Sequence, residues 1–72
     1  MVEWIKVESK LPEDERYCLC ATLSPYYGKG VAIGFYTDRL GKEYNGEKRW
    51  VIANEVNEDV VAWAEFNYYK YE

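Results

Sequence analysis

Cys18 and Cys20 are the residues whose types and spacing first suggest chemistry. Two residues apart on a strand, their side chains point the same way, and an internal disulfide across so tight a loop would distort the backbone. Two thiolates are too few for a tetrahedral zinc site, and the chain contains no His to complete one. The pattern predicts two small buried side chains in a strand, with a metal ligand pair and a redox thiol as alternatives.

The remaining polar residues do not form a catalytic arrangement. Without His there is no Ser-His or Cys-His nucleophilic pair. Carboxylates cluster at residues 13–15 and 55–59, in predicted loops, where a solvated run of charge is the ordinary interpretation, and neither cluster has the spacing of a calcium loop. Residues 28–30 (Gly-Lys-Gly) lack the spacing of a phosphate loop. We therefore expect no enzyme activity and no catalytic, metal-binding or cofactor-binding residues.

Aromatic side chains are the least easily dismissed feature. Trp4, Trp50 and Trp63 fall in three predicted strands, where they build the core or cover an open sheet face, with an aromatic cage for a cation as the alternative. Six tyrosines lie outside the confident strands: Tyr26, Tyr27, Tyr44, Tyr68, Tyr69 and Tyr71. Exposed tyrosines are typical of recognition surfaces, so these six are the candidate interaction residues. The equal alternative is that they fold back over a thin core.

The elements that must position these residues read as strands. Short β-branched and aromatic runs alternate with Gly, Pro, Asn and acidic clusters, which indicates an all-β domain spanning residues 1–72. The predicted strands are five and short, at residues 4–7, 17–23, 31–38, 50–53 and 60–66. Five short antiparallel strands predict a strongly bent meander or a small, partly open SH3-like barrel.

Connections between the strands carry three further expectations. Pro12 followed by three acids suits a turn or one helical turn near residues 12–15. Asn45-Gly46 predicts a tight type I′ hairpin turn, because both residues accept positive φ. Residues 67–72 either extend the last strand or fray.

Charge and hydropathy bear on the partner and the compartment. Thirteen acidic against nine basic residues give a net charge of −4, which opposes binding to nucleic acid or an anionic membrane. No apolar run approaches the roughly 20 residues that span a bilayer, and the first residues lack the pattern of a signal peptide. We therefore expect a cytoplasmic protein.

The front of the chain resembles a known family. Residues 4–7 (Trp-Ile-Lys-Val), Leu11-Pro12 with acids after it, and the apolar run at residues 17–23 are similar to the start of domain of unknown function 551, a small bacterial and phage-associated family. Residues 34–36 (Gly-Phe-Tyr) and Val60 to Trp63 match later family positions. The proline-rich segment that follows the last Trp in the family is missing here, and residues 39–48 are longer than the usual connection. The resemblance implies no activity and no site residues.

Two functions follow as hypotheses. The first is a non-catalytic binding or adaptor module that meets a protein partner, or itself, through its Tyr-rich loops and the edge of its sheet. The alternative is a small β-barrel that binds single-stranded nucleic acid by stacking bases on aromatic side chains.

Overall fold

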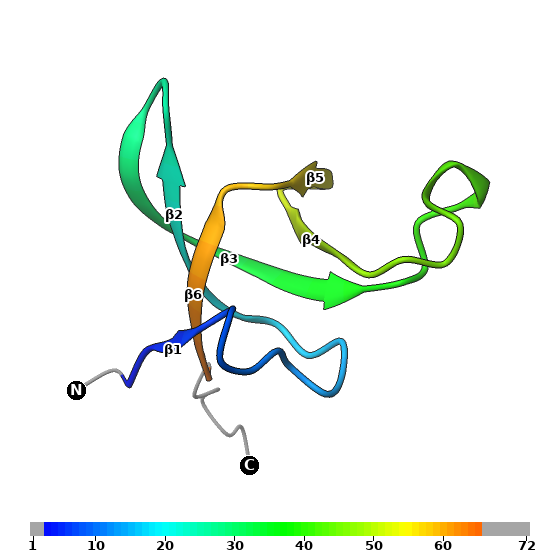
Figure 1. The fold of residues 1–72 in the computed structure, drawn as a ribbon, viewed down its shortest axis with the longest axis horizontal. Coiled ribbons are helices and arrows are strands. Elements are labelled where there is room, and N and C mark those ends of the chain that lie inside the picture. The colour runs from blue at the N-terminus through cyan, green and yellow to red at the C-terminus, as the bar shows by residue number, and fades with distance from the viewer. Residues whose placement is uncertain (1–2, 66–72) are drawn as a thin grey trace, which may run out of the picture.

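The computed structural model of the protein describes residues 3–65. These residues form a single open antiparallel sheet. Its elements are β1 (Ile5–Lys6), β2 (Cys18–Ser24), β3 (Gly28–Thr37), the 3-10 turn η1 (Lys42–Tyr44), β4 (Arg49–Ile52), β5 (Glu55–Asn57) and β6 (Val60–Glu65). The strand order is β1-β6-β2-β3-β4-β5, so β1 and β5 are the two edges. Figure 1 shows a strongly bent sheet that does not close into a barrel. The all-β prediction and the bent meander are confirmed.

The acidic segment after β4 contains a strand where a loop was expected, which makes six strands instead of five. β5 pairs with β4 in a tight hairpin, with Ile52 opposite Glu55 and Val51 opposite Val56. Ala53 and Asn54 form the turn in the left-handed region, at φ 54° and 64°. A single Val among polar residues is a weak strand signal, so this strand depends on its pairing with β4.

The helical turn lies elsewhere than expected. Residues 13–14 form a bend, in which Asp14 Oδ1 accepts a hydrogen bond of 3.2 Å from the backbone N–H of Arg16. Such a side-chain bond competes with helical hydrogen bonding. Within residues 3–65 the one 3-10 turn is η1, just before Asn45 and Gly46.

The Asn45-Gly46 turn has the backbone that its sequence predicts, with φ values of 53° and 76°. The β3–β4 ladder, however, ends at the pair of Thr37 and Arg49. The 3-10 turn uses the backbone groups that a ladder would need, because the N–H of Asn45 donates to the carbonyl of Lys42 at 3.1 Å. The connection is therefore a long excursion and not a tight hairpin.

The core lies on one face of the sheet, called the inner face below. Its buried members are Cys18, Cys20, Trp50, Val60 and Trp63. Partly buried side chains pack around them: Ile5, Val7, Tyr36 and Ile52. The segment of residues 7–17 lies on this side, because the indole N–H of Trp63 donates to the carbonyl of Lys10 at 2.8 Å. Two of the three Trp therefore build the core, as one of the interpretations predicted.

Gly34 marks the point where three strands meet most closely. It pairs with Cys18 on β2 and with Ile52 on β4. A Cβ at this position would lie 2.5 Å from the carbonyl oxygen of Val51 and 2.8 Å from Cγ1 of Ile52. Only glycine lets the backbones approach this closely, so this residue sets the spacing in the centre of the sheet.

Candidate interaction surface

The opposite face of the sheet, the outer face, is apolar. Val51 and Ala64 are buried on it, but the part over the β2–β3 hairpin is exposed. On β2 the inward residues Cys18 and Cys20 alternate with Leu19, Ala21 and Leu23, and the register places Ile33 opposite Leu19 and Val31 opposite Ala21. Leu23, Val31 and Ile33 are 52%, 65% and 49% exposed. β2 was expected to be apolar on both faces, and the structure shows that the two faces meet different surroundings.

A shallow groove of about 420 Å³ runs over this outer face. Its apolar lining comes from four strands or their flanks: Trp4, Ala21, Leu23, Val31 and Val61. Lys29 is the one charged residue among those that line it. The groove can therefore accept apolar side chains, with a single ammonium group at its border.

Two local features aim side chains into this groove. Ile5 pairs with Trp63 and packs on the core, so the preceding Trp4 lies on the other side of the chain and is 41% exposed. The register of β2 and β6 shifts between Ala21 and Thr22, which leaves Val61 as the extra residue of a bulge. Trp4 is thus separated from Trp50 and Trp63, which excludes an aromatic cage built from all three.

Tyr26 and Tyr27 occupy the tip of the β2–β3 hairpin and are 89% and 92% exposed. Both backbone N–H groups donate to Oγ of Ser24 at 3.1 Å, which fixes the three-residue loop. Leu23 precedes this loop and Lys29 follows it, so the tip continues the border of the groove. Residues 28–30, which were expected in the loop, belong to β3.

The other candidate tyrosines are not brought to this tip. Tyr44 lies in η1, at the far end of the molecule from the β2–β3 tip (Figure 1), and is half-buried. The Arg49 guanidinium lies 5.9 Å from the centre of its ring, a contact that gives Tyr44 a role inside the connection. Tyr68, Tyr69 and Tyr71 lie outside the described residues.

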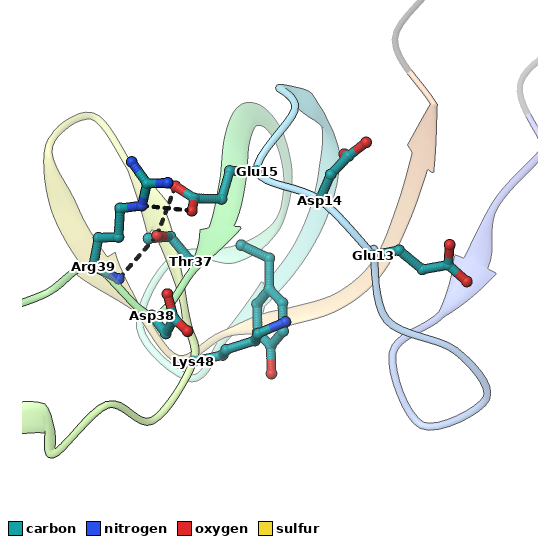
Figure 2. A pocket seen from close by; sticks show the side chains of 8 residues that line it. Glu13, Asp14, Glu15, Thr37, Asp38, Arg39 and Lys48 are labelled. Atoms are coloured by element: carbon teal, nitrogen blue, oxygen red, sulfur yellow. Dashed lines mark hydrogen bonds and ion pairs between the residues drawn. The ribbon is translucent and has the colours of Figure 1, made fainter.

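The first acidic cluster borders a second depression, of about 460 Å³ (Figure 2). Glu15 accepts a hydrogen bond of 2.9 Å from the buried Thr37 hydroxyl and forms an ion pair of 3.0 Å with Arg39. Asp14 pairs with Arg16 at 2.9 Å, and hydrogen bonds from Arg16 lower the pKa of Asp14. Figure 2 shows the carboxylates of residues 13–15 pointing in different directions. The cluster is thus a solvated and partly paired run of charge.

The two thiols are free and belong to the core. Cys18 is 4% exposed and Cys20 is fully buried, which confirms the prediction of two small buried side chains in a strand. The Cys20 thiol donates to the backbone carbonyl of Cys18 at 3.8 Å. Hydrogen bonding with Cys18, together with burial, raises the pKa of Cys20 far above its ordinary value and lowers that of Cys18. A thiol that stays protonated is a poor nucleophile. In the described part of the chain, no group of three or more Cys, Asp or Glu side chains could hold a metal ion.

Comparison with known proteins adds no relative. No family model, no curated protein and no solved structure matches the chain. The resemblance to domain of unknown function 551 stays a prediction. No helix found in residues 3–65 has the length and apolar character needed to cross a membrane.

Proposed function

We propose that this chain is a small, non-catalytic binding module that docks a protein partner on its outer face. The observation that carries the proposal is the groove of about 420 Å³, whose lining side chains are apolar except at its border. Leu23, Val31 and Val61, which line it, are each more than two-fifths exposed. Contiguous exposed apolar surface of this kind marks interaction sites in small proteins.

The tyrosines at the hairpin tip would extend this surface. Tyr26 and Tyr27 combine a large apolar ring with a hydroxyl, and their loop is held by Ser24. Ordering such side chains costs little entropy on binding, because Tyr has two rotatable side-chain bonds. We expect the partner to place apolar side chains in the groove and polar groups against the tip.

A protein partner is favoured over single-stranded nucleic acid. Surfaces that bind single strands combine stacked aromatic rings with a positive groove. Here the groove is lined mainly by aliphatic residues, with one Trp and one Lys, and the chain carries a net charge of −4. We place the module in the cytoplasm, where free thiols such as Cys18 and Cys20 stay reduced.

The test is affinity capture with the purified chain, followed by titration of each purified captured protein against defined variants. Leu23→Asp and Val61→Asp each put a carboxylate into the groove and should weaken binding at least tenfold, because the charge would be desolvated. Leu11→Asp is the matched control, since Leu11 is 40% exposed but lies outside the groove. A partner whose affinity is equal for wild type and both groove variants would refute the proposal.

A further inference from the structure

The long strand β3 has an unpaired edge along more than half of its length. One side pairs with β2 from Gly28 to Gly34, whereas the other side pairs with β4 only from Gly34 onward. Residues 28–33 therefore have no strand partner on that second edge within residues 3–65. In Figure 1, β3 leaves the hairpin with β2 and reaches β4 only in its second half.

Such an edge presents backbone N–H and C=O groups at alternate residues, ready to pair with another strand. Natural edges are usually protected by Pro, by a bulge, by several charges or by short length. Residues 28–33 contain no Pro and a single charged residue, Lys29. The register between β2 and β3 is continuous, without a bulge.

We propose that this edge pairs antiparallel with the same edge of a second copy of this chain. A two-fold axis perpendicular to the sheet produces this arrangement, with the outer faces of both copies on the same side. The inference goes beyond the proposed function because it uses the edge of β3 and not the groove on the outer face.

Two features select one register for this pairing. Gly34 already pairs with Ile52 on the same edge, and Lys29 carries a positive charge. Two residues directly opposite each other in a sheet point to the same face. Because side chains alternate between faces along a strand, the two-fold axis must pass through a residue and not between two residues. An axis at Val31 or Ala32 would bring Gly28 or Gly30 against Gly34, where Ile52 already pairs. An axis at Lys29 would place two ammonium groups opposite each other. With the axis at Gly30, Lys29 pairs with Val31 on both sides of the axis, and Gly28, whose φ is 76°, lies opposite Ala32 at the end of the ladder.

In this register the cross-strand neighbours are compatible. Lys29 lies opposite Val31 of the second copy, where its methylene chain can cover the 65% exposed Val31 side chain. Tyr27, in the loop just before β3, lies near Ile33 of the second copy, where its ring can cover the 49% exposed Ile33 side chain. Each pair occurs twice because of the two-fold axis. Gly30 carries no side chain, so nothing obstructs the close approach of the backbones at the axis.

The test is a pair of opposite charges at one exposed position, measured by sedimentation velocity of the full chain over a concentration series at low salt. V31E places a carboxylate opposite Lys29 of the second copy, twice in the dimer, and should tighten self-association about tenfold. V31K brings like charges together and should weaken it by a similar factor. The double variant K29E/V31K restores opposite charges and should recover the dimer.

Several results would overturn the inference. One is that the wild-type chain stays monomeric up to millimolar concentration. Another is that V31E and V31K change self-association equally. A dimer lost equally with V61E and V61K, but unaffected by the sign of the charge at Val31, would indicate pairing of outer faces instead. Far-UV circular dichroism confirms that each variant is folded. Lys29 and Val31 also line the groove, but the edge pairing depends on the sign of the charge at Val31, whereas partner binding is judged by the loss with Leu23→Asp and Val61→Asp, so the two proposals can fail independently.

Discussion

The indole N–H of Trp63 donates a hydrogen bond of 2.8 Å to the backbone carbonyl of Lys10, across 53 residues of sequence. This contact joins a core residue of β6 to the segment between β1 and β2. The same segment begins with a turn in which the N–H groups of Ser9 and Lys10 donate to the carbonyl of Lys6, and it includes the buried Pro12. Trp63 thus anchors the first part of this segment to β6, while Glu15 binds its last part to Thr37 and Arg39.

Trp63→Phe should lower the free energy of unfolding by about 1–3 kcal/mol, because the Lys10 carbonyl loses its partner and some apolar area is lost. Limited trypsin digestion should also become faster at Lys10 and Arg16. Trp50→Phe is the control, since Trp50 is similarly buried but has no bond to this segment. If both variants are cleaved at the same rate, the bond does not hold the segment.

Gly34→Ala should destabilise the fold by about 1–3 kcal/mol, because the added methyl group overlaps the Val51 carbonyl oxygen. The matched change Gly30→Ala meets only the hydroxyl of Thr22, at 3.0 Å, and should cost less. Urea unfolding of both variants measures the difference. Equal costs would contradict the close approach of β3 and β4 at Gly34.

Ala53→Asn should stabilise the protein by about 0.5–1 kcal/mol, because Ala53 adopts a φ of 54° that Asn tolerates better than Ala. The gain should appear as a higher urea midpoint with an unchanged slope. Ala62→Asn, in the middle of β6, is the control and should destabilise. A loss of stability with Ala53→Asn would argue against the left-handed turn at Ala53 and Asn54.

Raising the pH above about 9 should weaken the fold through Cys20. A hydrogen bond with Cys18 and burial raise the folded pKa of Cys20, while the same hydrogen bond lowers the pKa of Cys18. The folded pair therefore releases one proton where the unfolded chain releases two near pH 8.5. The stabilisation is complete below that unfolded pKa and falls by about 1.4 kcal/mol per pH unit above it.

Urea unfolding of wild type and the double variant Cys18→Ala/Cys20→Ala at pH 8 and pH 10, under reducing conditions, measures this effect. The free-energy difference between the two proteins should shrink by about 2 kcal/mol over this range. A difference that is the same at both pH values would show that Cys20 does not resist ionisation in the fold.

Sequence patterns identified some of the exposed aromatic residues but not all of them. Tyr26 and Tyr27 were found because two aromatic residues stand between a Ser-Pro break and a Gly, and the structure places both at an exposed tip. Tyr44 also stands beside a turn signal, Asn45-Gly46, yet its ring contacts Arg49 inside the β3–β4 connection. For Trp4 the sequence left the core and an open sheet face as alternatives, because a strand pattern does not indicate which face will be covered. The structure places Trp4 on the outer face.

The all-β class and most of the strands could be predicted from the sequence alone, because the two-residue period of a strand is a local pattern. The burial of Cys18 and Cys20 followed from residue type, since free Cys is among the most buried residues. Three features required the tertiary structure: β6 inserts between β1 and β2, the segment bonded to Trp63 covers the inner face, and residues 28–33 have an edge with no strand partner among residues 3–65. These outcomes depend on pairings between residues far apart in the chain. Both faces of β2 are apolar, so the local pattern could not choose between them.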